Sequence, residues 1–238
     1  MALKLITLDL DDTLWHTAPV MRRAEQACYD WICAHCAGFA DLYSLEGLRQ
    51  YKSELAECYP SLQHQMSQLR FETLRRAAMQ TGCDRNSARA LADSAFAVFA
   101  HERSTLELFA GAEVMLQQLA THWPLIAVTN GNADLEKVGI RHYFSAHLNA
   151  ETIGAAKPAP DLFHAALAHA VVEPHECLHI GDHPHHDIDA AHAAGLHTLW
   201  VNLNESPWPD AFASPTLQVS ALSDVVEQVT QWQRQLSH

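Results

Sequence analysis

Four short apolar segments of this 238-residue chain end directly in polar loops, and this feature limits the possible folds more than any other. The segments span residues 3–10, 125–129, 177–181 and 197–201. Continuous apolar runs of this length are typical of parallel β-strands that are buried on both faces, because helices cover both sides of such a sheet. Ligands of these sheets bind at the carboxyl ends of the strands, so the polar loops are where we expect function.

Helical patterns separate the apolar segments. They cover residues 112–122, 161–171 and 187–194; Pro160 precedes the second, and Gly195 ends the third. Proline at a helix start and glycine just beyond a helix end are common boundary signals. Alternating strands and helices predict an α/β fold with a Rossmann-like parallel sheet, covered by helices on both faces.

The stretch from residue 18 to residue 105 departs from this alternation. It holds four helical periodicities, at 20–37, 45–57, 61–80 and 87–101, and few strand signals. We therefore predict an all-helical second domain over 18–105, inserted into a sheet domain formed by 1–17 and 106–238. A final amphipathic helix is expected over 222–236, where Trp232 would pack against the domain.

Charge and apolar run length exclude several classes of protein. The chain carries 15 Lys and Arg against 28 Asp and Glu, a formal net charge of -13, which excludes the basic footprint that nucleic acid requires. No apolar run approaches the roughly 18 residues of a membrane span, and the first run reaches Asp9 before it could serve as a signal-peptide core. We expect no nucleic-acid or membrane partner and a cytoplasmic location.

Six cysteines are expected to stay reduced in such a compartment. Cys33 and Cys36 have the spacing of a redox or zinc pair. They fall in a helical stretch, with no strand before them and no second close pair after them. This context favours two structural thiols on neighbouring helix turns.

Aspartates follow two of the predicted strands. Asp9 and Asp11 close the first strand, and Asp182 and Asp187 follow the third. Four carboxylates at neighbouring strand ends would repel one another unless a cation joined them. Magnesium suits such a site, because it prefers carboxylate, water and phosphate oxygens. A solvated loop acid or a helix cap explains a single aspartate well, but it explains four together poorly.

Two further polar motifs follow predicted strands. Thr129, Asn130 and Gly131 offer a hydroxyl and backbone N–H groups of the kind that hold phosphate oxygens. Lys157 and Pro158 precede the helix predicted from residue 161. Taken singly, the first motif is an ordinary turn and the second an ordinary surface loop, so their meaning depends on their order in the chain.

That order resembles the haloacid dehalogenase superfamily of phosphotransferases. The motifs are Asp-x-Asp-x-Thr, Thr-Asn-Gly, Lys-Pro and Gly-Asp-x-x-x-x-Asp, and the resemblance covers the whole chain. The helical insertion looks like the type-1 cap of that superfamily. The resemblance implies a magnesium-dependent phosphomonoester hydrolase that acts on a small phosphorylated metabolite through an aspartyl-phosphate intermediate.

The resemblance also implies a role for each motif. Asp9 would be the nucleophile that attacks phosphorus, and Asp11 would protonate the leaving alcohol and then deprotonate the attacking water. Thr129 and the backbone of Asn130 would hold phosphoryl oxygens, while Lys157 would neutralise charge. The chemistry agrees, because phosphoryl transfer depends mainly on positioning and charge neutralisation.

By the same resemblance, Mg²⁺ would be bound by Asp9, the backbone carbonyl of Asp11 and Asp182, with Asp187 orienting the ligands. Asp11 also distinguishes phosphatases from dehalogenases, because the hydrolytic dehalogenases of the superfamily carry a different residue at its position. Its presence favours a phosphatase. Phosphomutases retain the acid, so the motif leaves that alternative open.

Three histidines in the last motif have a second interpretation. His183, His185 and His186 could bind a transition metal, because imidazole suits zinc, nickel and copper. A non-catalytic metal- or ligand-binding protein is therefore the remote alternative. Ordinary loop variation in a chain with 17 histidines is the simpler interpretation.

Within the superfamily the chain is most similar to bacterial flavin mononucleotide phosphatases that also act on 5-amino-6-(5-phospho-D-ribitylamino)uracil. The similarity lies in residues 8–15, 70–72 and 123–132. It implies a substrate of riboflavin metabolism, with a nucleotide or sugar phosphate as the alternative. We expect a monomer or a weak homodimer.

Overall fold

The structure is a computed structural model that describes residues 2–236, and the chain forms two compact units. The sheet unit comprises residues up to 16, 107–131 and the chain from 139 onward. The helical unit comprises 17–106 and 132–138. Whether these units are separate domains, a sheet domain and a cap domain that fold independently, stays a prediction.

The sheet unit contains six parallel strands in the order β3-β2-β1-β4-β5-β6. This arrangement confirms the predicted α/β fold. Every residue of the two strands nearest the sheet centre, β1 and β4, is buried, as expected for strands with helices on both faces. The strands are β1 Leu5–Leu8, β2 Leu125–Thr129, β3 Ala146–Asn149, β4 Cys177–Gly181, β5 His197–Val201 and β6 Leu217–Val219.

The apolar runs predicted four of these strands and missed the two at the edges of the sheet. β3 reads Ala-His-Leu-Asn and β6 reads Leu-Gln-Val, and each has one buried residue. An edge strand faces solvent along one side, so it does not need a continuous apolar run. Such short, mixed segments look like loops in the sequence.

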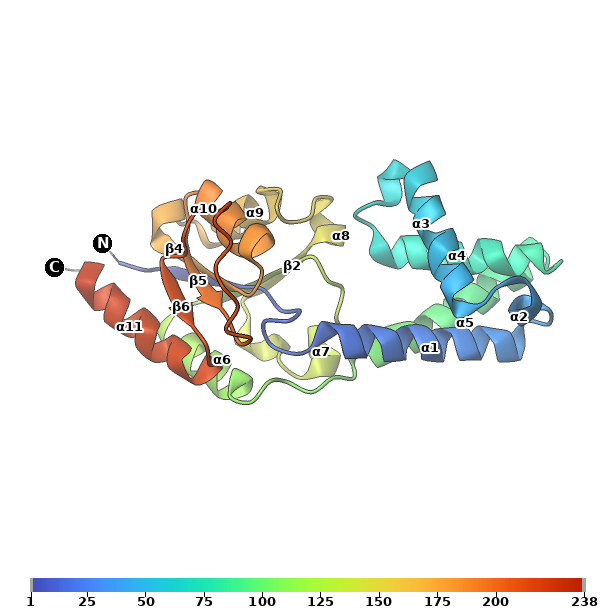
Figure 1. The fold of residues 1–238 in the computed structure, drawn as a ribbon, viewed down its shortest axis with the longest axis horizontal. Helices are drawn as coiled ribbons and strands as arrows, with labels where there is room; N and C mark the ends of the chain where they lie inside the picture. The colour runs from blue at the N-terminus through green and yellow to red at the C-terminus, as the bar shows by residue number, and fades with distance from the viewer. Residues whose placement is uncertain (1, 237–238) are drawn as a thin grey trace. The chain divides into compact units, whose positions relative to one another are not determined.

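Helices cover both faces of the sheet. Figure 1 shows α9 and α10 on one face and α6 and α11 on the other. Trp232 of α11 is buried, as expected for a packing residue. The helices of this unit are α6 Ala112–His122, α8 Ala150–Ile153, α9 Asp161–Ala170, α10 Ala190–Ala193 and α11 Val225–Leu236.

The register of the central strands brings their carboxyl ends together. Leu8 of β1 lies opposite Ala127 of β2 on one side and Ile180 of β4 on the other. The residues that follow these three strands therefore meet at one edge of the sheet. This edge holds the aspartates and the threonine motif singled out in the sequence.

The helical unit is built around small residues. Six alanines and Phe39, Ile32 and Phe99 belong to its buried core, and α1 and α4 both pack against α5. Ser44 and Asp84 cap α3 and α5 by accepting backbone N–H groups, which accounts for where these helices begin. The helices are α1 Thr17–His35, α2 Phe39–Leu42, α3 Leu45–Cys58, α4 Met66–Gln80, α5 Arg85–Ser104 and α7 Leu135–Val138.

Several predicted helices differ from the structure in their boundaries, and two of these differences have a clear local cause. The helix predicted over 61–80 begins only at Met66, because Pro60–Leu62 forms a separate 3-10 turn. The helix predicted over 187–194 begins earlier, as a π-helix over Pro184–Asp189 that continues into α10. In this π-helix the N–H of Ile188 reaches the carbonyl of His183, five residues back.

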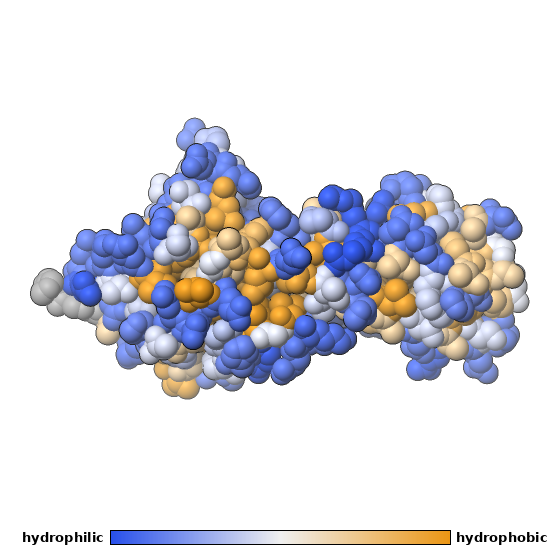
Figure 2. Space-filling model, turned by 90° about the horizontal axis from the view of Figure 1, so that it is seen from below, coloured by the Kyte–Doolittle hydropathy of each residue, from blue (hydrophilic) through white to orange (hydrophobic). Residues whose placement is uncertain are grey.

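The face of the molecule shown in Figure 2 carries both hydrophilic and hydrophobic residues. On the face shown in Figure 2, hydrophobic residues form a band over the sheet unit. None of the helices within residues 2–236 is long and apolar enough to cross a membrane. All six cysteines are free thiols; Cys36 lies 3.8 Å from Cys83, measured between sulfur atoms.

Candidate active site

All seven residues predicted for the site line one cavity of about 420 Å³ in the sheet unit. Asp9 directly follows β1, Thr129 ends β2, and Asp182 directly follows β4. The strand register brings these positions together, as the sequence predicted. The cavity is lined by Asp9, Asp11, Asp12, Thr129, Asn130, Gly131, Lys157, Asp182, His183, His186 and Asp187.

Lys157 is the buried cation of this site. Its Nζ donates to Oδ1 of Asp9 at 2.6 Å, to Oδ1 of Asp187 at 2.6 Å and to the carbonyl of Val128 at 2.9 Å. Burial acts to lower the pKa of Lys157, but Asp187 and Asp9 raise it above its usual value. The ammonium group therefore stays charged and is held between two carboxylates.

Asn130 fixes the loop that carries Lys157. Its side-chain amide donates to the Lys157 carbonyl at 2.9 Å, and its side-chain oxygen accepts the Lys157 backbone N–H at 2.7 Å. These two bonds join the loop after β2 to the segment before α9. The neighbouring Thr129 hydroxyl accepts the N–H of Gly131 at 2.9 Å, which closes a tight turn at the cavity wall.

Thr13 connects the carboxylates that follow β1 and β4. Its hydroxyl lies 3.2 Å from Oδ2 of Asp9 and 3.0 Å from Oδ1 of Asp182, as a donor shared between both. The indole N–H of Trp200 donates to the Asp182 backbone carbonyl at 2.7 Å and fixes the start of that loop. Asp9 and Asp182 are thereby held to the same side of the cavity.

Asp11 occupies a tight turn after β1. The indole N–H of Trp15 donates to Oδ1 of Asp11 at 2.9 Å, which orients this partly exposed carboxyl group. Asp12 has a positive φ of 60°, and its N–H donates to the carbonyl of Trp15 at 2.9 Å. Aspartate tolerates this left-handed conformation better than most residues, so Asp12 suits its position in the turn.

Three carboxylates form a group that fits a divalent cation. Oxygen atoms of Asp9, Asp182 and Asp187 lie within 4.8 Å of one another, and no other such group of acids, histidines or cysteines occurs among residues 2–236. Burial raises the pKa of Asp9, and burial together with Asp187 raises the pKa of Asp182 to about 7. One lysine cannot balance three carboxylates, two of them buried, and an all-oxygen donor set suits magnesium.

Asp187 is held from several directions. Oδ2 accepts the backbone N–H of His183 at 2.9 Å, and burial, which would raise the pKa of Asp187, is outweighed by Lys157 and His179. Its side chain lies over Gly181, where an added Cβ would come within 2.5 Å of the carboxyl carbon. The glycine of the last motif is therefore required by the close approach of Asp187.

The sequence interpretation missed His179, which supports this carboxylate from inside the sheet. Its Nε2 lies 3.3 Å from Oδ1 of Asp187, and its Nδ1 lies 2.9 Å from the hydroxyl of Thr7 on β1. His179 and Thr7 are fully buried. A polar residue at the centre of an otherwise apolar strand was the available signal, because buried polar groups need partners.

The three histidines of the last motif do not form a metal group. His183 caps the π-helix, because its Nδ1 accepts the backbone N–H groups of His185 and His186. The rings of His183 and His186 stack with centroids 4.1 Å apart, and the ring of His185 stacks on Phe212. This arrangement corrects the remote alternative of a histidine metal site, since the capping nitrogen of His183 already accepts two hydrogen bonds.

Comparison with known proteins identifies the family. Residues 3–195 match the haloacid dehalogenase-like hydrolases, and this segment includes every predicted site residue. The chain belongs to the haloacid dehalogenase-like hydrolases. The predictions of this family and of an enzyme are therefore confirmed.

Individual members of the family resemble the chain over almost its whole length. The 5-amino-6-(5-phospho-D-ribitylamino)uracil phosphatase YigB of Escherichia coli is 30% identical over 92% of this chain and 93% of its own. A phosphoserine phosphatase of Thermus thermophilus is 30% identical, with coverage of 94% and 98%. A solved structure described as 2-haloacid dehalogenase from Pseudomonas syringae has a TM-score of 0.91 and 39% identity, with coverage of 97% and 99%.

Proposed function

We propose that the protein is a magnesium-dependent phosphomonoester hydrolase that forms an aspartyl-phosphate on Asp9. The observation that carries this proposal is the contact between Asp9 and Lys157 in a cavity that is also lined by Thr129 and four further carboxylates. A carboxylate can attack an anionic ester only when neighbouring cations reduce the repulsion. Lys157 is placed to do so.

In the first half of the reaction, a carboxylate oxygen of Asp9 attacks phosphorus, and the bond from phosphorus to the leaving oxygen breaks. Asp11 gives its proton to that oxygen, which departs as the alcohol. In the second half, Asp11 takes a proton from water, and the water oxygen attacks phosphorus. The bond between Asp9 and phosphorus then breaks and inorganic phosphate is released.

The other residues position these groups. Thr129 and the backbone of Asn130 are proposed to hold phosphoryl oxygens, and the Asn130 side chain keeps the Lys157 loop in place. Trp15 orients the acid–base residue Asp11. Thr13 orients Asp9 for attack.

The acidic cluster supports magnesium as the cofactor. Asp9 and Asp182, with the backbone carbonyl of Asp11, would hold the ion, and Asp187 would orient this group. When bound, magnesium would neutralise charge on the carboxylates and on the phosphoryl oxygens. Burial and the neighbouring carboxylate of Asp187 raise the pKa of Asp9 and of Asp182, and a bound cation would favour the charged form of both groups.

For the substrate, we propose a phosphorylated intermediate of riboflavin metabolism or flavin mononucleotide. The similarity to the Escherichia coli phosphatase over nearly the full chain supports this choice. A nucleotide or sugar phosphate is the alternative. A phosphate-release screen with magnesium across flavin-pathway, nucleotide and sugar phosphates tests it; a best rate on a sugar phosphate with none on flavin mononucleotide would overturn it.

Dehalogenation is a second candidate, favoured by the similar structure from Pseudomonas syringae. It would use Asp9 to attack carbon in place of phosphorus. The retained acid at Asp11 argues against it, since that chemistry has no alcohol to protonate. We expect no halide release from L-2-chloropropionate under conditions in which para-nitrophenyl phosphate is hydrolysed; halide release with no phosphate release would favour the dehalogenase.

The Asp9→Asn variant tests the phosphatase proposal. It should lose phosphate release from para-nitrophenyl phosphate by at least about a thousandfold, because an amide is a poor nucleophile. Asp93→Asn, the same substitution at an exposed position of α5 that does not line the cavity, is the control and should retain most activity. Unchanged hydrolysis by Asp9→Asn would show that the mechanism is wrong.

A further inference from the structure

Two thiols from distant parts of the chain lie in contact inside the helical unit, away from the residues assigned to the reaction. The sulfur atoms of Cys36 and Cys83 are 3.8 Å apart, although the two residues are 47 positions apart in the sequence. Cys36 directly follows α1, and Cys83 lies in the turn between α4 and α5. The sequence singled out Cys33 and Cys36 as a pair, whereas the structure places Cys83 in contact with Cys36.

The backbone around both cysteines is held by hydrogen bonds. The N–H of Cys36 donates to the carbonyl of Ile32 at 2.8 Å, and its carbonyl accepts the N–H of the buried Phe39 at 3.1 Å. On the other side of the contact, Thr81 ends α4, and Asp84 caps α5 by accepting backbone N–H groups. Since α1 and α4 both pack against α5, the contact between the thiols follows from the packing of these three helices.

Thr81 lies beside both sulfur atoms. Its hydroxyl oxygen is 3.4 Å from Sγ of Cys36 and 3.3 Å from Sγ of Cys83. The hydroxyl donates its proton to the carbonyl of Ala78 at 2.8 Å, so its oxygen is left to accept an S–H group. Thr81 therefore orients the thiols, and at 3.8 Å no other atom fits between the two sulfurs.

The two thiols differ in their exposure. Cys36 is only 2% exposed, whereas Cys83 is partly exposed. Burial raises the pKa of Cys36 above its usual value, and the neighbouring Cys83 acts in the same direction. A small oxidant therefore reaches Cys83 first, and Cys36 is the thiol positioned to react with the oxidised sulfur.

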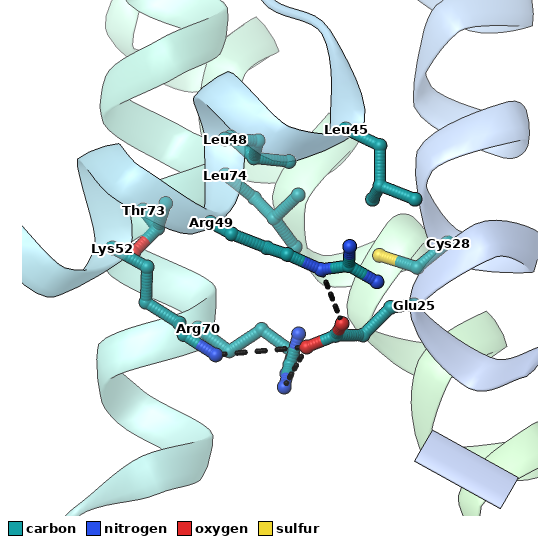
Figure 3. Close-up of a pocket in the computed structure, with 9 residues that line it drawn as sticks. All are labelled: Glu25, Cys28, Leu45, Leu48, Arg49, Lys52, Arg70, Thr73 and Leu74. Carbon is teal, nitrogen blue, oxygen red and sulfur yellow. Dashed lines mark hydrogen bonds and ion pairs between the residues drawn. The ribbon is translucent and has the colours of Figure 1, made fainter. Parts of the chain in front are cut away.

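Cys28, in the same unit, has a different environment. Figure 3 shows it among the residues that line a small space, together with Leu45, Leu48 and Leu74. Burial raises the pKa of Cys28 to about 11, so its thiol stays neutral. Buried cysteines of this kind are inert, which makes Cys28 an internal comparison for the Cys36–Cys83 pair.

We propose that Cys36 and Cys83 are a site of reversible oxidative modification, at which a peroxide converts the two thiols into a disulfide. The sulfur atoms have to move from 3.8 Å to about 2 Å apart, a shift that small side-chain rotations supply. In a reducing compartment such a bond is transient and forms in response to an oxidant. The site is independent of the proposed phosphatase activity.

The oxidation takes place in two steps, with hydrogen peroxide as the oxidant. The sulfur of Cys83 attacks the peroxide: an S–O bond forms, the O–O bond breaks, and one water leaves, so the sulfur is oxidised to a sulfenic acid while the peroxide is reduced. The sulfur of Cys36 then attacks that of Cys83: the S–S bond forms, the S–O bond breaks, and the oxygen leaves with the Cys36 proton as a second water. A dithiol reductant restores both thiols.

The disulfide would join the end of α1 to the start of α5 and close a loop that contains α2, α3 and α4. Closing a long loop restricts the unfolded chain, so the oxidised protein should melt about 5 °C higher than the reduced protein. Cys83→Ser, treated with peroxide in the same way, should show no such increase. An equal melting temperature of oxidised and reduced wild type would contradict this stabilising effect.

Peptide mapping of the full chain after treatment with hydrogen peroxide tests the site. The remaining thiols are alkylated, and digestion with trypsin in the absence of reductant is followed by mass spectrometry. Residues 24–49 and 77–85 are separate tryptic peptides, and the second contains Cys83 as its single cysteine. We expect the two peptides to be joined in most chains and to separate after reduction with dithiothreitol.

The first peptide holds three cysteines, so variants assign the bond. Cys36→Ser and Cys83→Ser should both lose the joined peptide, and the second of these changes a partly exposed position, so its variant should fold. Cys28→Ser and Cys33→Ser are the matched controls and should keep it. In Cys36→Ser the sulfenic acid on Cys83 has no thiol to react with, so dimedone should label Cys83.

Two results would overturn the proposal. One is separate alkylation of Cys36 and Cys83 at a peroxide concentration that oxidises the exposed Cys58. The other is a joined peptide that persists in Cys36→Ser, which would assign the bond to Cys28 or Cys33. Both results are read from the peptides, so neither depends on catalytic activity.

Discussion

At the scale of single residues, a chain of buried contacts connects the sheet interior to Asp9. Thr7 binds His179, His179 binds Asp187, and Asp187 binds Lys157, which binds Asp9. The motifs in the sequence predicted the last three members, because charged residues at strand ends are conspicuous. Thr7 and His179 lie within strands, so only their polar character in an apolar run could have pointed to them.

Removing His179 tests its role as a positioning residue for Asp187. We expect His179→Phe to lower kcat about tenfold with little change in KM, since a lost hydrogen bond to a carboxylate costs about 1.5–3 kcal/mol. His179→Asn, which keeps a donor, should recover part of the rate. The control is His197→Phe on the neighbouring strand; an equal loss of kcat there would show that the effect is only structural.

The raised pKa of Asp182, about 7, predicts how magnesium affinity depends on pH. Below pH 7 the folded protein binds a proton at Asp182 that the unfolded chain releases near pH 4, so without metal the stability falls as pH rises between these values. Magnesium must displace this proton. The increase in melting temperature on adding magnesium should therefore be larger at pH 8 than at pH 6, and an equal increase at both would contradict the assignment.

At the scale of elements, helices and strands could be predicted from the sequence where burial gives them a regular apolar pattern. Central strands and amphipathic helices follow periodic apolar patterns, so β1, β2, β4 and β5 were found. The edge strands β3 and β6 have one solvent-facing side and carry no such pattern. The π-helix that carries Asp187 depends on the cap formed by His183, a contact that residue spacing does not encode.

The end of α9 contains a residue poorly suited to its conformation. Val171 has φ 55° and ψ 52° and is 88% exposed, and its N–H and that of Val172 both reach the carbonyl of Leu167. Glycine is favoured here, because a β-branched side chain is strained in the left-handed region. Val171→Gly should raise the free energy of unfolding by about 1 kcal/mol.

Denaturant unfolding measures this effect. Val114→Gly is the matched control, because Val114 is 56% exposed in the first turn of α6, where the backbone is helical. There the same substitution should lower the free energy of unfolding by a few tenths of a kcal/mol. A loss of stability in Val171→Gly as well would show that the strain at the end of α9 has been misassigned.

At the scale of the whole molecule, the net charge of -13 is distributed unevenly. The sheet unit has four Lys and Arg against sixteen Asp and Glu, whereas the helical unit has eleven against twelve. The acidity thus belongs almost entirely to the unit that is proposed to bind an anionic substrate. Lys157 and the proposed magnesium ion would reverse the sign only inside the pocket.

This distribution predicts a dependence on ionic strength. At saturating magnesium, raising the salt from about 20 to about 200 mM should increase kcat/KM for para-nitrophenyl phosphate about twofold, because screening weakens the repulsion at long range. The value of kcat should change little, since it describes the bound complex. A steep decrease of kcat/KM with salt would contradict this prediction. It would mean that the attraction of the pocket for the substrate outweighs the repulsion from the negative charge of the sheet unit.

The formation of a covalent bond at Asp9 is the central claim, and chemical trapping tests it most directly. In Asp11→Asn, the phosphoenzyme formed from para-nitrophenyl phosphate should accumulate, because the base that activates water is missing. Borohydride reduces an acyl phosphate to an alcohol, so mass spectrometry should find homoserine at position 9 and none in the double variant with Asp9→Asn. Reduction at another carboxylate, or at none while nitrophenol is released in a burst, would contradict the account.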